Sequence, residues 1–208
     1  MARPKIDFKV EFTYRIINKD IIDITAPMKE QIYIISGTNK TMIIDNGMGI
    51  GSLKEYIKQF NLHKDIIMVD THGHPDHAGG NIEFDNCYLN PLDLPVYKKM
   101  VTKKYRAGDV RNIFANDGKI LIDNLLDFKE NTLPLVDGQE FDLGNRKIKC
   151  YLVPGHTEGS MVLYDENTKT LFVGDALTLK ETWLYLWYST SLKTYYESLL
   201  HPSQSDEI

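Results

Sequence analysis

The stretch THGHPDHAGG, residues 71–80, places three histidines and an aspartate within six positions, from His72 to His77. The whole chain has six histidines, so half of them are concentrated here. Imidazole nitrogens and carboxylate oxygens are the ligands that suit zinc, manganese and iron. The stretch therefore predicts a metal site.

The local spacing is suited to such a site. His72 and His74 are two positions apart in an extended chain, so their imidazoles point to the same side. Pro75 turns the chain next, because its ring fixes φ at about −65°. Asp76 and His77 then face the same volume from the other side.

Other candidate ligands also follow predicted strands. Since α/β folds place their chemistry at the carboxyl ends of strands, we expect these side chains to converge. Three strands are involved: residues 65–70 lead to His72 and His74, residues 146–153 lead to His156, and the hairpin of residues 160–175 ends at Asp175.

The rest of the chain alternates strands and helices, and we expect a single domain over residues 1–208. Residues 102–132 show no clear period, which predicts an irregular segment that can act as a lid. Further strands are predicted at residues 8–17, 31–37, 40–47 and 86–90, and helices at residues 51–60, 94–101 and 191–200.

Composition argues against several classes of partner. The formal net charge is −5 and no basic stripe is present, so neither nucleic acid nor an anionic membrane is expected. Residues 1–12 do not resemble a secretory signal, and no apolar run is long enough to span a membrane. We expect a cytoplasmic protein that acts on a small molecule. Cys87 and Cys150 have no CxxC partner and are predicted to be buried thiols.

Four ordered segments resemble the motifs of the metallo-β-lactamase fold superfamily: IIDNG at residues 43–47, THGHPDHAGG at 71–80, PGHTEGS at 154–160 and LFVGDAL at 171–177. The resemblance covers nearly the whole chain. It implies an α/β fold, a four-layer αββα sandwich of two mixed sheets with helices on the outer faces.

The resemblance also implies roles for single residues. Asp45 would support the metal site, although an ordinary turn aspartate is an equal alternative. Zinc is the expected metal, with one or two ions per chain, and iron or manganese are also compatible. His72, His74 and His156 would bind the first ion, Asp76 and His77 the second, and Asp175 would bridge both.

The expected reaction is metal-assisted hydrolysis of an ester, thioester, lactone or amide. A metal-activated water would attack the carbonyl, and Asp76 would act as the catalytic residue that orients this water and takes its proton. One alternative is a mononuclear iron dioxygenase that uses His72, His156 and Asp175 to act on a persulfide. Another is a metal-binding protein with weak or no catalysis.

The superfamily pattern continues with a strand and a loop that bears one more histidine. Here the helix of residues 191–200 is followed by HPSQSDEI, so we expect that the final strand and loop are lacking and that the second ion is held more weakly. The DEI of residues 206–208 resembles the start of that strand. His201 is interpreted as an ordinary residue at a helix end.

Substrate contacts and oligomeric state stay unknown from the sequence. Trp183, Tyr185, Trp187 and Tyr188 are numerous enough to wall a pocket, but core packing is the slightly favoured interpretation. Arg106 and Arg111 are interpreted as solvated surface residues, with contact to an anionic substrate as the alternative.

Overall fold

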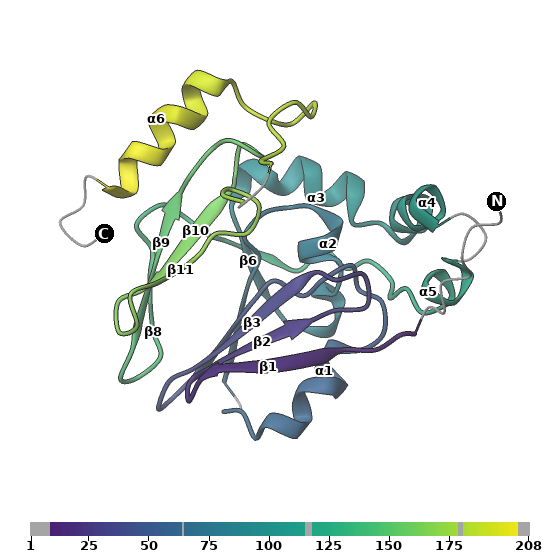
Figure 1. The fold of residues 1–208 in the computed structure, drawn as a ribbon, viewed down its shortest axis with the longest axis horizontal. Helices are drawn as coiled ribbons and strands as arrows, with labels where there is room; N and C mark the ends of the chain where they lie inside the picture. Colours follow the sequence, from purple (N-terminus) through teal and green to yellow (C-terminus); the bar gives the residue numbers. More distant parts are fainter. Residues whose placement is uncertain (1–8, 64, 115–117, 179–180, 204–208) are drawn as a thin grey trace.

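Two β-sheets face each other across an apolar layer (Figure 1). The computed structural model describes residues 9–63, 65–114, 118–178 and 181–203, and for residues 201–203 it describes the backbone alone. The predicted strand start at residues 206–208 and the side chain of His201 therefore lie outside what is described. No helix among the described residues is both long and apolar enough to cross a lipid bilayer.

The larger sheet has seven strands within the described residues, in sequence order from β1 to β7. Antiparallel ladders join the strands from β1 to β4, and parallel ladders join those from β4 to β7, so the sheet is mixed. Its strands are β1 (Thr13–Asn18), β2 (Ile21–Thr25), β3 (Gln31–Ser36), β4 (Thr41–Ile44), β5 (Ile66–Val69), β6 (Cys87–Leu89) and β7 (Thr132–Pro134).

The smaller sheet is antiparallel, with the order β11-β10-β9-β8 over the part of the chain that is described. Because β9 and β11 both run antiparallel to β10, their carboxyl ends lie at the same edge. The strands are β8 (Glu140–Asp142), β9 (Lys147–Leu152), β10 (Met161–Asp165) and β11 (Thr170–Phe172).

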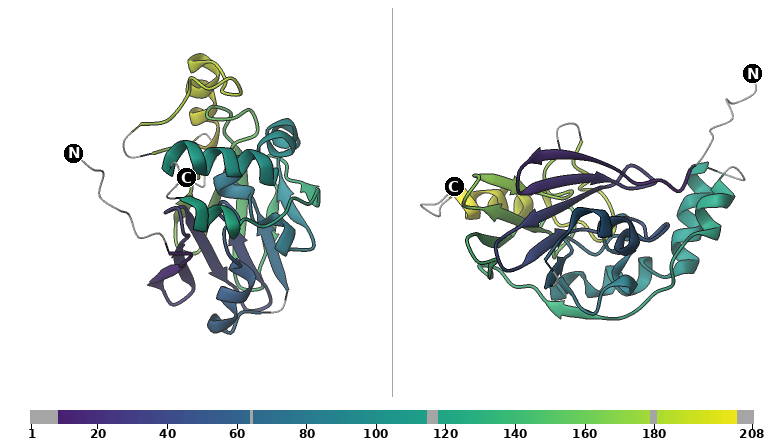
Figure 2. Two further views of the ribbon diagram at one scale, coloured as in Figure 1. Left: turned by 90° about the vertical axis from the view of Figure 1, so that its right-hand side faces the viewer. Right: turned by 90° about the horizontal axis from the view of Figure 1, so that it is seen from below.

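The core lies between the sheets, where Met42 and Ile44 belong to the same buried cluster as Cys150 and Leu163. On the outer face of the larger sheet, α1 (Leu53–Tyr56) and the 3-10 turn η1 (Ile57–Phe60) pack against β2, β3 and β4. On the outer face of the smaller sheet, α6 (Leu192–Ser203) packs through Leu199. Figures 1 and 2 show these helices on opposite sides of the sheets, which confirms the predicted αββα layers.

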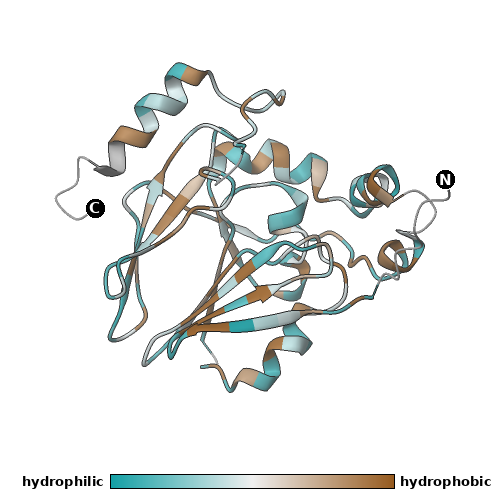
Figure 3. Cartoon of the chain, viewed as in Figure 1, coloured by the Kyte–Doolittle hydropathy of each residue, from teal (hydrophilic) through white to brown (hydrophobic). Residues whose placement is uncertain are grey.

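Hydropathy follows this layering: in Figure 3 the strands carry long hydrophobic segments, whereas the helices alternate between hydrophobic and hydrophilic residues. Cys87 and Cys150 are both buried and free, as predicted. Shorter elements connect strands of the larger sheet: α2 (Pro75–Ala78) and η2 (Asn81–Glu83) lie between β5 and β6, and η3 (Pro91–Asp93) and α3 (Leu94–Met100) follow β6.

The prediction of an irregular segment at residues 102–132 is wrong. Within the described residues this segment forms α4 (Lys103–Phe114) and α5 (Lys119–Asp123), which pack together and against the loop after β4. Its period is hard to recognise because the buried face of α4 contains Arg106 beside Ala107 and Val110, so a charged residue interrupts the apolar pattern.

Arg106 is fully buried, so its interpretation as a solvated surface residue is wrong, whereas Arg111 is exposed as predicted. Burial lowers the pKa of the Arg106 guanidinium to about 10, which still leaves it charged at neutral pH. The guanidinium joins the loops around α4 by hydrogen bonds. It donates to five main-chain carbonyls, those of Met48, Gly79, Val101, Leu126 and Asp127.

We predict that Arg106→Ala destabilises the protein by about 3 kcal/mol or more, because several buried carbonyls lose their donor. Arg106→Lys should rescue only part of this loss, since a single ammonium cannot reproduce the planar fork of donors. Urea unfolding measures the change. Arg111→Ala on the exposed side of the same helix is the control. An equal loss of unfolding free energy in both alanine variants would contradict the stabilising role of the Arg106 hydrogen bonds.

Candidate metal centre

Three imidazoles from two loops meet at one point. His72 and His74 lie in the loop after β5, and His156 lies in the loop between β9 and β10. His74 Nδ1 lies 2.9 Å from His72 Nε2 and 2.9 Å from His156 Nε2. All three side chains are buried, and their ligand atoms have the spacing of a group that can hold one metal ion.

The protonation of these rings suits a cation. His156 Nδ1 lies 2.8 Å from the Trp183 carbonyl, which can only accept, so this nitrogen carries the proton and Nε2 keeps its lone pair. The Thr71 hydroxyl donates to Asp45 and therefore accepts from His72 Nδ1, which leaves a lone pair on His72 Nε2 as well. Only one of these two lone pairs can receive a proton from His74 Nδ1, so a cation fits the point where the three nitrogens meet.

The electrostatics favour neutral imidazoles. Burial, reinforced by the neighbouring imidazoles, lowers the pKa of His72 well below its ordinary value. The same causes lower the pKa of His74 to about 3. Since neutral imidazole is the form that binds metal ions, the two rings are ready for coordination at any pH above mild acidity.

A second group of candidate ligands adjoins the first. His77 Nε2 lies 3.5 Å from Asp76 Oδ2 and 3.5 Å from Asp175 Oδ1, while Asp175 Oδ2 lies 3.5 Å from His156 Nε2. The two oxygens of Asp175 thus face the two groups, one each. His72, His77 and Asp175 form a second set with metal-ligand spacing.

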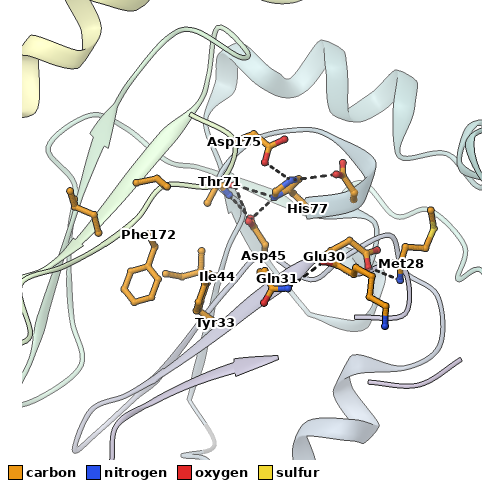
Figure 4. Close-up of a pocket in the computed structure, with 15 residues that line it drawn as sticks. Met28, Glu30, Gln31, Tyr33, Ile44, Asp45, Thr71, His77, Phe172 and Asp175 are labelled. Carbon is orange, nitrogen blue, oxygen red and sulfur yellow. Dashed lines mark hydrogen bonds and ion pairs between the residues drawn. The ribbon is translucent and has the colours of Figure 1, made fainter. Parts of the chain in front are cut away.

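Asp45 orients His77 from behind (Figure 4). Its Oδ2 lies 2.7 Å from His77 Nδ1, and the Thr71 amide and hydroxyl also donate to the same carboxylate. Nδ1 therefore carries a proton, and Nε2 is turned towards Asp76 and Asp175. Burial lowers the pKa of His77, but the Asp45 and Asp76 carboxylates outweigh it and raise the pKa well above its ordinary value.

The backbone brings Asp175 close to the loop after β5. Gly174 has φ of 48°, and a Cβ on it would lie 2.5 Å from Thr71 Oγ1. Only glycine therefore allows this approach without a shift. Burial raises the pKa of Asp175, but its hydrogen bond to His77 and the charge of that ring outweigh burial and lower the pKa to about 2.

Asp93 joins the two ligand loops, and sequence reasoning missed it. One carboxylate oxygen accepts from the Gly73 amide at 2.7 Å and from the Thr157 hydroxyl at 2.7 Å, and the other accepts from the Gly159 amide at 2.8 Å. The side chain is fully buried. Its sequence context, PLDLP, contains no signal for this role, because its partners lie up to 66 positions away.

Two cavities open on these ligands. One, of about 390 Å³, lies beside His77 and Asp45 between the sheets (Figure 4). The other, of about 450 Å³, lies beside His74 and His156. Trp183 and Tyr188 line the second cavity, and Tyr185 and Trp187 are exposed, so the interpretation of this aromatic segment as core packing is wrong.

The chain also matches known proteins in sequence and in fold. Residues 27–207 match the family model of the metallo-beta-lactamase superfamily. The human acyl-coenzyme A thioesterase MBLAC2 is 28% identical over 165 residues, a match that covers 72% of this chain and 58% of the thioesterase. The hydroxyacylglutathione hydrolase of Methylococcus capsulatus is 31% identical over 110 residues, which cover 53% of this chain and 33% of that enzyme. The chain thus spans less than two thirds of the length of these relatives.

Solved structures share the fold. A metallo-beta-lactamase from Pontibacter korlensis superposes with a TM-score of 0.65 at 17% identity, over 93% of this chain and 86% of that one. A protein solved in a di-iron-bound form superposes with a TM-score of 0.62 at 22% identity, over 85% of this chain and 82% of that one. The family match over most of the chain, together with this fold, shows that the chain belongs to the metallo-beta-lactamase superfamily.

Proposed function

We propose that the protein is a metal-dependent hydrolase that cleaves thioesters of small molecules. The observation that carries the proposal is the position of Asp175, whose two oxygens each lie 3.5 Å from a nitrogen of a different ligand group. A carboxylate shared in this way suits a pair of cations held close together.

Zinc is the metal that we propose, because the ligand atoms are imidazole nitrogens and carboxylate oxygens. When bound, the metal supplies Lewis acidity and lowers the pKa of a coordinated water to about 7. His72, His74 and His156 would hold the first ion, Asp76 and His77 would hold the second, and Asp175 would be shared between them.

Asp76 is the carboxylate best placed to orient a water molecule and take its proton. Asp45 is occupied by Thr71 and His77, and Asp175 lies between two histidines. Asp76, by contrast, has a side chain that is 43% exposed and lines both cavities. It therefore has access both to the ligand cluster and to a bound substrate.

The substrate class follows from two arguments. Several relatives that match this chain are named as thioesterases or as hydroxyacylglutathione hydrolases. A thiol also has a pKa of about 8.5, so it leaves a tetrahedral intermediate as thiolate with little help from an acid. A site that is rich in carboxylates and neutral imidazoles suits such a leaving group better than it suits an amine.

The dioxygenase alternative requires an iron site without His74. No observation favours it, because His74 Nδ1 lies equally close to both partner histidines. The alternative of a weakly catalytic metal-binding protein differs from the hydrolase in turnover alone, so activity measurements separate them.

We predict that the purified protein contains zinc and hydrolyses thioesters, and that His74→Ala lowers kcat/KM by at least about 100-fold, because metal ions contribute several kcal/mol to stabilising the transition state. Elemental analysis and a panel of thioesters, lactones and phosphodiesters measure both properties. Iron with oxygen consumption would instead indicate the dioxygenase. Turnover of the parent protein no higher than that of His74→Ala on every substrate would contradict hydrolysis.

We predict that Asp45→Asn lowers zinc affinity by about 10- to 100-fold, because the amide cannot hold the Nδ1–H of His77 as a carboxylate does. Asn tolerates the left-handed backbone at this position, where φ is 61°, so the fold should be kept. Competition with a chromogenic zinc chelator measures the affinity. The exposed carboxylate of Asp123 provides the control Asp123→Asn, and an unchanged affinity in Asp45→Asn would remove Asp45 from the site.

A further inference from the structure

The cavity of about 450 Å³ reaches from His74 and His156 to helix α4 and residues 183–188. Four of the candidate ligands line it: His74, Asp76, His156 and Asp175. Its volume lies within the range of small-molecule pockets. A group bound in it would therefore have one end at the candidate metal centre.

The outer wall of this cavity is largely apolar. Its apolar lining residues include Met48, Met100, Ile113 of α4, Leu186 and Trp183. Methionine side chains adapt to irregular apolar groups. Trp183 is 52% exposed, so part of its ring is free to be covered by a ligand.

Apart from the cations proposed for the metal centre, the charged groups that line this cavity are all acidic among the described residues, since no lysine or arginine lines it. Besides Asp76 and Asp175, the lining includes Glu30 and Asp109. Glu30 accepts from the amides of Met28 and Met48, at 2.8 Å each. Asp109 on α4 has no hydrogen-bond or ion-pair partner within the part of the chain that is described.

Asp109 is thus a carboxylate without a partner, partly buried beside apolar side chains. Burial, together with the charge of Asp76, raises its pKa above the ordinary value. The Asp109 carboxylate would repel a negatively charged group of a ligand in the cavity, and solvent screens this repulsion less there than at the open surface.

We propose that this cavity holds the acyl group of the substrate, that the group it accepts is an apolar chain without negative charge, and that Asp109 is a specificity-determining residue that rejects acyl chains ending in a carboxylate. This inference rests on the proposed thioester hydrolysis. It assigns the thiol carrier to the outside of the cavity, because a carrier with phosphate or carboxylate groups would meet the same repulsion.

Trp183 provides a binding assay that does not depend on hydrolysis. The chain has two tryptophans, so Trp187→Phe leaves Trp183 as the single indole fluorophore. The ligands are two ketone analogues of an eight-carbon N-acetylcysteamine thioester, in which methylene replaces sulfur. One acyl chain ends in methyl and the other in carboxylate.

In the Trp187→Phe background we expect the methyl-ended analogue to change Trp183 fluorescence and to bind at least about tenfold more tightly than the carboxylate-ended one. Asp109→Lys should remove or reverse this preference, and Asp109→Asn should reduce it. The matched control is Glu140→Lys, which makes the same change of charge on exposed β8 and should keep the parent preference.

Equal binding of both analogues to the parent, or equal shifts in Asp109→Lys and Glu140→Lys, would overturn the proposal, as would a failure of the methyl-ended analogue to bind. The corresponding octanoyl and suberoyl thioesters should show the same order in kcat/KM. If neither thioester is hydrolysed while the binding preference and its loss in Asp109→Lys are observed, the hydrolase proposal fails and the assignment of the cavity stands.

Discussion

The candidate metal centre depends on the contact of Asp93 with two loops that belong to different sheets. The loop with His72 and His74 follows β5 of the larger sheet, and the loop with His156 follows β9 of the smaller one. A buried carboxylate is costly unless hydrogen bonds compensate it, and Asp93 accepts three. Because its donors include both Gly73 and Gly159, the loops cannot separate without the loss of at least one of these hydrogen bonds. The meeting of three imidazoles is therefore a property of the sandwich as a whole.

Buried carboxylates that accept several hydrogen bonds also follow the neighbouring parallel strands β4 and β5. Asp45 follows β4 and fixes Thr71 and His77, whereas Asp70 follows β5 and accepts from the side-chain amides of Asn46 and Asn81. Parallel strands end at one edge, so these groups form a layer directly beneath the ligands. A layer that is held by several buried hydrogen bonds gives the ligands fixed positions, which metal binding and catalysis both require.

The sequence predicts this edge well because its signals are local. His72, His74 and His77 lie within six positions, and strand periodicity places His156 and Asp175 at strand ends. The residues that were misjudged act over long distances. Arg106 is charged and lies in a stretch without a clear period, which suggests a surface residue, and its acceptors are main-chain carbonyls, which carry no side-chain signature. Asp93 likewise binds main-chain amides of glycines far away in sequence. The exposed aromatics after Asp175 resemble a core segment in composition, and only the position of the sheets shows that they lie at an edge.

Trp183 connects the candidate metal ligands with the wall of the cavity of about 450 Å³. Its carbonyl accepts from His156 Nδ1 at 2.8 Å, while its side chain lines the cavity. The Ser189 hydroxyl ties the same segment to the His156 carbonyl at 2.9 Å, so main-chain and hydroxyl contacts hold the segment in place. Since the orientation of His156 uses the backbone of Trp183 and not its ring, the ring can be replaced without loss of that hydrogen bond. Cavity shape and ligand orientation are therefore separable here, even though one residue contributes to both, so a side-chain change in this segment can alter the cavity without moving the ligands.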